Sequence, residues 1–169
     1  MARFFLDHVW YFITVPTNDH EPIFHRLEFR GVLLEKLQTA FRKFSINKYH
    51  FSIMSDHYHI LIYVHEGAVI PKLLHFIHGG TSFQLHLDRP TSIWGEYHVY
   101  VHATEELLDR VAGYVVGNPI KHGEVKTFDA LLIWPFSSFS LLVEQVGRIS
   151  AQEMVHSTIA LEDADFSVR

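Results

Sequence analysis

Apolar residues follow two different periods along this chain. Continuous or alternating runs that are rich in aromatic and β-branched residues are typical of strands. The run over residues 58–64 is apolar on both faces, as expected of a central strand. Ser55 and Asp56 precede it and predict a short turn, so the strand before that turn is expected to be its neighbour. Strands are expected over residues 4–15, 46–54, 58–64 and 96–102.

Elsewhere the apolar residues recur at helical spacing. Thr104 followed by two acidic residues suits a helix start. Gly79 and Gly80 predict a kink or a boundary, and Asn118 before Pro119 predicts a helix end. The order of elements predicts an α+β sandwich, with helices packed on a mainly antiparallel sheet. Helices are expected over residues 22–44, 70–87, 105–117 and 141–155, followed by a loose acidic tail.

Composition limits the class of protein. The chain has 169 residues, of which 48% are hydrophobic, and this predicts one compact domain. It has no cysteine, which excludes disulfides and thiolate metal sites. No signal peptide and no apolar run long enough to span a bilayer is visible, so we expect a cytoplasmic protein.

The net charge of −5 argues against a protein that grips duplex DNA mainly by charge. Basic residues nevertheless gather in and around the first expected helix. A solvated helix face is the simpler interpretation of this cluster, and a small basic groove is the alternative. The cluster consists of Arg26, Arg30, Lys36, Arg42, Lys43 and Lys48.

His57 and His59 flank Tyr58 at the start of the third expected strand. Residues two apart on a strand point to the same face, so the two imidazoles project together. Two imidazoles on a rigid strand form half of a divalent-metal site. Because the chain has 14 histidines, two polar residues that face solvent are the simpler explanation when the spacing is taken alone.

Tyr114 and Asn118 lie four residues apart near a helix end and therefore share a face. A tyrosine hydroxyl is a poor nucleophile at neutral pH, but it becomes useful beside a base or a metal-polarised phosphate. An amide oxygen is a hard ligand that suits Mg²⁺ or Mn²⁺. From spacing alone, an ordinary buried tyrosine and a C-terminal cap are the alternative.

Three motifs resemble those of the HUH nucleases, in the same order along the chain. The run FSIMSDHYHILI, which contains His57 and His59, resembles their metal motif. The run YVVGNPIKHG, which starts at Tyr114, resembles the tyrosine helix of single-tyrosine HUH transposases, especially the REP-associated tyrosine transposases. The run WPFSS, which starts at Trp134, resembles their Trp-Pro-aromatic-Ser-Ser segment.

The resemblance implies a ferredoxin-like sandwich, with a transposase domain over residues 1–140. Residues 141–169 are expected to form a C-terminal helix and a tail that is partly disordered. The resemblance also implies that His57, His59 and Asn118 bind one divalent ion, Mg²⁺ or Mn²⁺, and that Tyr114 is the nucleophile. Attack by Tyr114 on a DNA phosphate would form a 5′-phosphotyrosine and free a 3′-hydroxyl, and a later 3′-hydroxyl would reverse the step.

The family acts on single-stranded DNA, often at hairpin-bearing ends, and many members are homodimers. The candidate DNA contacts are Lys121 and His122 beside the site, Trp94 as a stacking surface, and Arg42 and Lys43 from the basic cluster. A solvated helix cap is the alternative for Lys121 and His122, and core packing is the alternative for Trp94.

The chain departs from the family pattern at Glu124, where an apolar residue is preferred, and in helix 70–87, where Lys72 is the single Lys or Arg. These departures leave two alternatives to a transposase that cuts and rejoins DNA. One is a domesticated, non-cutting DNA-binding module of the same fold. The other is a metal-dependent phosphodiesterase in which water attacks and Tyr114 only positions the substrate.

Overall fold

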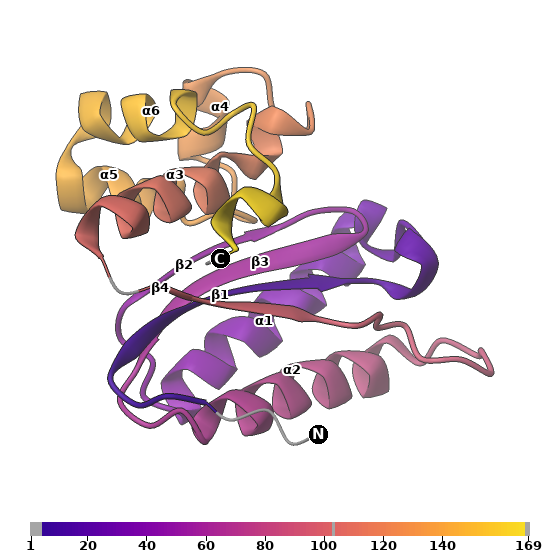
Figure 1. Ribbon diagram of the computed structural model, residues 1–169. Helices are drawn as coiled ribbons and strands as arrows, with labels where there is room; N and C mark the ends of the chain where they lie inside the picture. The colour runs from indigo at the N-terminus through magenta and orange to yellow at the C-terminus, as the bar shows by residue number, and fades with distance from the viewer. Residues whose placement is uncertain (1–4, 103, 168–169) are drawn as a thin grey trace.

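The computed structural model describes residues 5–102 and 104–167. Its centre is a four-stranded sheet of order β2-β3-β1-β4, in which every neighbouring pair is antiparallel. Helices cover both faces of this sheet (Figure 1), so the predicted α+β sandwich is confirmed. Within the described residues, no helix is both long and apolar enough to cross a membrane. The strands are β1 (Val9–Pro16), β2 (Tyr49–Ile53), β3 (His57–Val64) and β4 (His98–His102).

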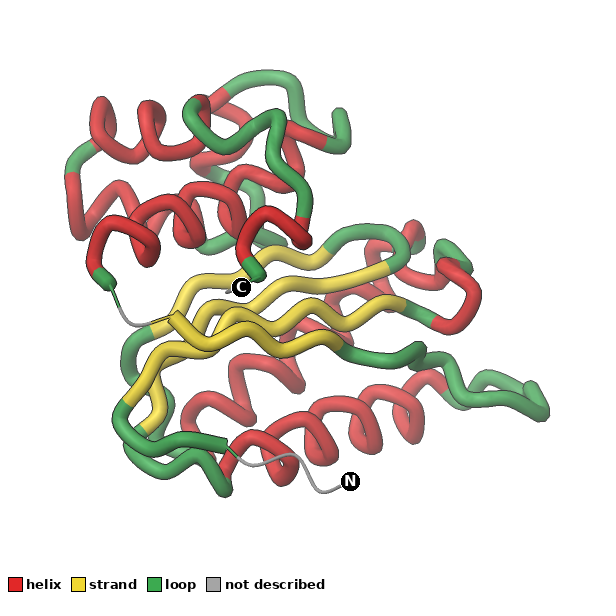
Figure 2. Tube along the Cα trace, viewed as in Figure 1, coloured by secondary structure: helices red, strands yellow, loops and turns green. Residues whose placement is uncertain are grey.

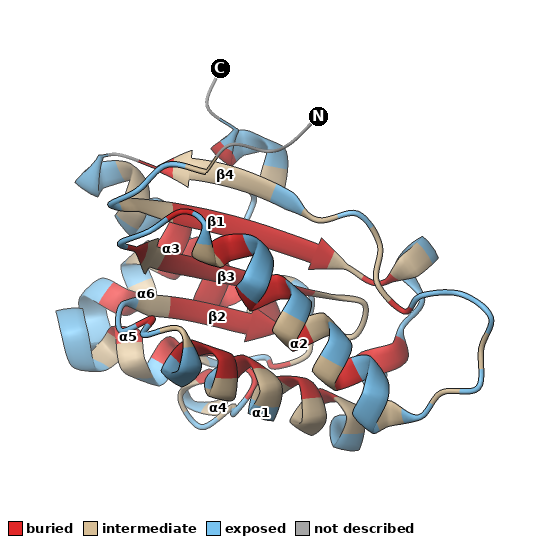
Figure 3. Cartoon of the chain, turned by 90° about the horizontal axis from the view of Figure 1, so that it is seen from below, coloured by how far each residue is buried: buried red, intermediate tan, exposed pale blue. Residues whose placement is uncertain are grey.

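Helices α1 (Leu27–Lys43) and α2 (Val69–Leu85) cover one face of the sheet (Figure 2). Alternate residues of β3, among them Tyr58 and Ile60, point into the apolar core beneath these helices. Seen from this side, β1, β2 and β3 are mostly buried, whereas the edge strand β4 is largely half-buried (Figure 3). The period-two pattern of the sequence therefore places one set of strand side chains in a continuous apolar layer.

A second helical layer covers the other face. A separate apolar core joins this layer to Phe12 of β1 and Leu61 of β3. The short 3₁₀ helix η3 (Asp163–Phe166) brings the end of the chain back between α3 and the sheet (Figure 1). The helices of this layer are α3 (Glu105–Lys121), α4 (Phe128–Leu132), α5 (Phe139–Val146) and α6 (Arg148–His156).

Two glycines allow α3 and α6 to touch. A Cβ atom on Gly113 would lie 2.4 Å from the Met154 carbonyl oxygen, and one on Gly117 would lie 2.5 Å from Val155 Cγ1. Any larger residue at either position would have to push the helices apart. Because Tyr114 follows Gly113 directly, the direction of its side chain depends on this contact.

Several predicted helix boundaries were wrong. Helix α2 runs through Gly79 and Gly80 without a break. Helix α3 continues past Asn118, because Pro119 lies in its last turn and the following N–H groups still find acceptors. The N–H groups of His122 and Glu124 donate to the carbonyls of residues 118 and 119, each at 2.9 Å.

The remaining differences lie at the two ends of the chain. The single helix expected over 141–155 is two helices that are separated at Gly147, whose φ is 85°. Helix α4 was not predicted. The first strand begins at Val9, and Phe4, where it was expected to begin, lies outside the described residues.

A buried ion pair links α1 to the segment after α3. The Arg30 side chain is only 3% exposed, its Nε donates to the Phe24 carbonyl at 2.9 Å, and its guanidinium pairs with the Glu124 carboxylate. The solvated helix face expected for the basic cluster is therefore wrong for Arg30. The pair also explains why Glu124 occupies a position where the family prefers an apolar residue, since a buried arginine requires a carboxylate partner.

Candidate active site

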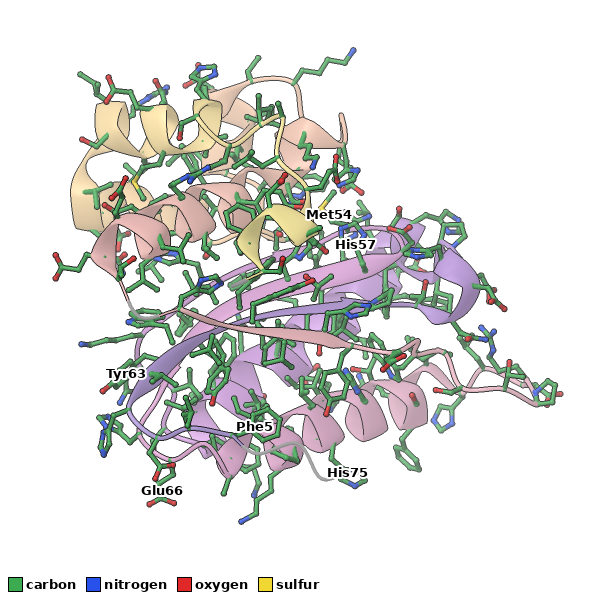
Figure 4. The ribbon with its side chains drawn as sticks, in the orientation of Figure 1. Phe5, Met54, His57, Tyr63, Glu66 and His75 are labelled. Carbon is green, nitrogen blue, oxygen red and sulfur yellow. The ribbon has the colours of Figure 1, made fainter. Side chains whose placement is uncertain are left out.

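A cavity of about 550 Å³ lies between the sheet and α3. Strands β1, β3 and β4 contribute to its lining, and the segment 162–164 forms a further wall. His57, at the start of β3, lies where the sheet meets the upper helical layer (Figure 4). The aromatic and imidazole side chains that line the cavity are His20, His57, His59, His98, Tyr100, Tyr114 and His122.

His59 is held by one ring nitrogen and leaves the other free. Its Nδ1 is 2.9 Å from Thr14 Oγ1, on the neighbouring strand β1. Its Nε2 is buried and has no hydrogen-bond partner among the described residues. Burial lowers the pKa of His59 well below 6.5, so the imidazole is neutral at physiological pH. A neutral imidazole with a free nitrogen is the form that binds a metal ion.

His57 is oriented in the same way by Asp56. Its Nδ1 donates to Asp56 Oδ1 at 2.6 Å, since a carboxylate can only accept. This bond holds the pKa of Asp56 below its usual value of 3.8, and His20 Nδ1 lies 3.4 Å from the other carboxylate oxygen. The rings of His57 and His59 are 4.7 Å apart. A carboxylate on Nδ1 that leaves Nε2 free is the usual support of a metal-binding histidine.

Asn118 lies behind the cavity wall and is fully buried. Its Nδ2 donates to the Tyr114 carbonyl at 2.8 Å, whereas its Oδ1 has no partner at hydrogen-bond geometry. The amide also interacts with the His59 and Tyr114 side chains, and it raises the pKa of His59 and lowers that of Tyr114. A buried polar atom without a partner costs about 1–3 kcal/mol. The orphaned Asn118 Oδ1 and His59 Nε2 therefore fit a divalent ion.

A metal site in this cavity depends on the Asn118 amide as a ligand. Within the described ranges, no three His, Cys, Asp or Glu side chains are arranged to hold a metal ion. A site built on His57 and His59 therefore needs a third protein ligand of another type, and Asn118 is an amide of the right hardness for Mg²⁺ or Mn²⁺.

Tyr114 is buried at the cavity wall, with its ring 5.6 Å from that of His59. Its hydroxyl donates to Asp163 Oδ1 at 2.6 Å, and its ring packs 4.7 Å from that of Phe166. Burial and the Asp163 carboxylate raise the pKa of Tyr114 above its ordinary value of 10.0. The phenol is therefore neutral at physiological pH.

Two of the predicted DNA contacts lie at the site. Lys121 Nζ is 3.1 Å from Glu162 Oε1, bonds to the Leu161 carbonyl and lies 5.0 Å above the Tyr114 ring. The His122 ring is 5.3 Å from that of His57, and burial lowers its pKa. His122 lines the cavity, whereas Lys121 lies beside Tyr114 and is not one of the residues that line it.

The other three predicted DNA contacts lie on the opposite face of the sheet. Trp94 packs with its ring 4.4 Å from that of His78 in α2, and its Nε1 donates to the His78 carbonyl. Arg42 and Lys43 form the last turn of α1. The cavity and these three residues are therefore separated by the sheet, and Trp94 contributes to the apolar core.

The sequence did not point to four residues of this site. Thr14 and His98 come from neighbouring strands, and only the strand register brings them level with His59. Asp56 directly precedes His57, and that adjacency was its one local signal. Asp163 lies 49 residues after Tyr114, and no pattern in the sequence links the two.

A family model described as "Transposase IS200 like" matches residues 6–116, about two-thirds of the chain. The chain belongs to the IS200-like transposase family. The predicted family is thus confirmed, and membership supports a transposase role and a DNA-cleaving enzyme in general. The matched part of this IS200-like transposase contains His57, His59 and Tyr114 and ends before Asn118.

Comparison with solved structures confirms the fold. One match is a REP-associated tyrosine transposase bound to a REP hairpin, with a TM-score of 0.69 and 21% identity over 86% of this chain and 85% of that one. A second, described as a transposase from Deinococcus radiodurans, has a TM-score of 0.47 and 17% identity over 68% of this chain and 94% of that one. No curated protein sequence matches.

Proposed function

We propose that this IS200-like transposase cleaves and rejoins single-stranded DNA through a covalent bond between Tyr114 and DNA. One observation carries the proposal: two oriented imidazoles and the Tyr114 side chain line one cavity, with a buried, unpartnered amide oxygen behind them. Strand β3 and helix α3 supply these groups from opposite sides. The structurally similar REP-associated transposase was solved with a REP hairpin, which supports a hairpin-bearing single strand as the substrate class.

His57, His59 and Asn118 are the proposed ligands of one divalent ion, Mg²⁺ or Mn²⁺. When bound, such an ion polarises a phosphate oxygen and orients the scissile bond. The protein fixes the donors in advance. Asp56 and Thr14 hold the two imidazoles by their Nδ1 atoms, and the Tyr114 carbonyl holds the Asn118 amide. This preorganisation fixes both rings by Nδ1 and leaves both Nε2 atoms for the ion.

In the proposed reaction, the Tyr114 oxygen attacks a phosphorus atom of the DNA backbone. A 5′-phosphotyrosine forms and a 3′-hydroxyl leaves. The phosphodiester energy is kept in the protein–DNA bond, so a 3′-hydroxyl of another strand can attack it and complete the joining without ATP. His122, which lines the cavity beside His57, is the proposed contact to the phosphate oxygens, and Lys121 beside Tyr114 is a second candidate.

The decisive experiment is a denaturing gel of the protein with a 3′-labelled hairpin oligonucleotide and Mn²⁺. We expect a labelled protein adduct in the wild type, its loss in Tyr114→Phe, and mass-spectrometric mapping of the nucleotide to the peptide that contains Tyr114. Tyr100→Phe is the matched control, because Tyr100 is the other phenol that lines the cavity.

Three other outcomes would reject the proposal. An adduct that persists in Tyr114→Phe would assign the covalent step to another residue. Free 5′-phosphate products without an adduct would indicate a water-using phosphodiesterase. Binding of the hairpin without cleavage under any divalent metal would indicate a DNA-binding module.

A further inference from the structure

Asp163 is held in a fixed position against the Tyr114 hydroxyl. It begins η3, whose start is closed by reciprocal bonds between Glu162 and Asp165, with the Glu162 N–H donating to Asp165 Oδ2 at 2.8 Å. At the other end of η3, Phe166 is buried and packs with its ring 4.7 Å from that of Tyr114. A capped and anchored turn therefore presents the Asp163 carboxylate to the phenol.

The Asp163 carboxylate is available to accept a proton. Among the described residues it forms no ion pair, and the nearby Lys121 pairs with Glu162 instead. Asp163 lines the same cavity as Tyr114 and His57, and about 550 Å³ remains open beside them. The segment is therefore a wall of a cavity whose volume is large enough for a phosphate group.

The chemistry of Tyr114 requires such an acceptor. A phenol with an ordinary pKa of about 10 is neutral at physiological pH, so the proton has to leave as the oxygen attacks, and the Tyr114 hydroxyl already donates to Asp163 Oδ1 at 2.6 Å. Two of the imidazoles that line the cavity are committed elsewhere, and Asp163 is the lining residue that accepts the hydrogen bond from the Tyr114 hydroxyl. His57 bonds to Asp56 and His59 to Thr14 through Nδ1, and the proposed function assigns their Nε2 atoms to the metal ion.

We propose that Asp163 is the general base for Tyr114, an inference that rests on the function proposed above. As the bond between the Tyr114 oxygen and phosphorus forms and the bond from phosphorus to the 3′-oxygen breaks, the phenolic proton passes to Asp163 Oδ1. The leaving 3′-oxygen takes a proton from water. In the joining step, the attacking 3′-hydroxyl gives its proton to water, and Asp163 returns its proton to the phenolic oxygen.

The first test is Asp163→Asn, which keeps the shape and the hydrogen-bond acceptor but cannot take the proton. The rate of adduct formation in a single turnover is expected to fall by about 10²–10⁴, with melting temperature and Mn²⁺ affinity unchanged. Asp163→Glu, which retains a carboxylate, keeps a larger part of the rate. Asp109→Asn is the control, because Asp109 is exposed on the same helix as Tyr114 and should react like the wild type.

The second test replaces Tyr114 with a ring-fluorinated tyrosine, whose more acidic phenol depends less on a base. Fluorination should restore part of the rate lost in Asp163→Asn and change the wild-type rate little, a rescue that a purely structural role of Asp163 would not produce. The assignment is overturned if Asp163→Asn reacts as fast as the wild type, or faster, or if fluorination gives no rescue. A failure of the proposed function itself is distinguished by Tyr114→Phe, which would then retain the adduct.

Discussion

The two faces of the sheet differ in their buried polar atoms, although the same strands form both. The face under α1 and α2 is an apolar core in which Thr81 Oγ1 is the one unpartnered buried atom among the described residues of these strands and helices. The face under α3 carries most of the unpartnered buried atoms of the described chain. They are Ser52 Oγ, His59 Nε2, His102 Nδ1, His102 Nε2 and Asn118 Oδ1.

Strand β3 shows the contrast within one element. Tyr58 and Ile60 are fully buried on the α1/α2 face, whereas His57 and His59 line the cavity on the other. A buried polar atom without a partner destabilises the fold, so a face that keeps several of them gives up stability for another purpose. The α1/α2 face is therefore mainly a packing surface, whereas the α3 face combines an apolar core with a cavity that polar side chains line.

Of the substitutions that separate the two faces, Asn118→Leu has the largest expected effect. If the amide is a metal ligand, adduct formation should fall by about a thousandfold, because an oriented ion contributes several kcal/mol to the transition state. The free energy of unfolding should change by only about 1 kcal/mol, because the variant loses the hydrogen bond to the Tyr114 carbonyl but also removes a buried oxygen that has no partner. Activity close to that of the wild type would remove Asn118 from the site.

Ile60 follows His59 in the sequence but lies on the other face of the sheet. The opposite result is expected for its substitution. Ile60→Ala should lower the free energy of unfolding by about 3 kcal/mol, since it leaves a cavity in a fully buried core. Urea denaturation measures this loss. The Mn²⁺ affinity of the folded fraction should equal that of the wild type, and a large drop in affinity would show that the two faces are not independent.

Asp56→Asn tests the support of the metal ligands. The variant can still accept the bond from His57 but loses the charge, so Mn²⁺ affinity should fall by about tenfold to a hundredfold. Calorimetric titration gives the value directly. Asp7→Asn is the control, because Asp7 accepts a hydrogen bond from the Gly67 N–H away from the cavity. Equal affinities for both variants would mean that Asp56 does not orient His57.

The smallest expected effects are those of substitutions at one glycine from each helical layer. Gly113→Ala should destabilise the protein by about 1–2 kcal/mol, because its Cβ would lie 2.4 Å from the Met154 carbonyl oxygen. Gly79→Ala, on the open side of α2, should stabilise it by up to about 1 kcal/mol, because alanine favours helix and nothing lies within 4 Å of the added atom. Thermal denaturation of both variants checks the sign, and a stabilising Gly113→Ala would contradict the close contact of α3 with α6.

Local periodicity was sufficient for the fold class and for part of the site. A period of two brought His57 and His59 to one face, and a spacing of four placed Tyr114 and Asn118 together, whatever the rest of the chain does. Helix boundaries were less predictable. Tertiary contacts around the last turn of α3 kept it helical through Pro119, against the local preference of the residue before a proline.

The partners of the site residues could not be predicted, because they come from the way the chain returns on itself. Thr14 meets His59 through the pairing of β1 with β3, and Asp163 meets Tyr114 because the last segment folds back under α3. Arg30 and Glu124 meet because the segment after α3 returns to α1. Each residue alone is an ordinary threonine or charged group, and only the three-dimensional arrangement gives it a role.

The most direct test of the central claim is a crystal structure of the protein soaked in Mn²⁺, with the ion located by its anomalous scattering. The account predicts one peak in the cavity, bonded to His57 Nε2, His59 Nε2 and Asn118 Oδ1, with the Tyr114 hydroxyl facing the same space. A Mn²⁺ ion bound elsewhere while these three atoms remain without a ligand would contradict it.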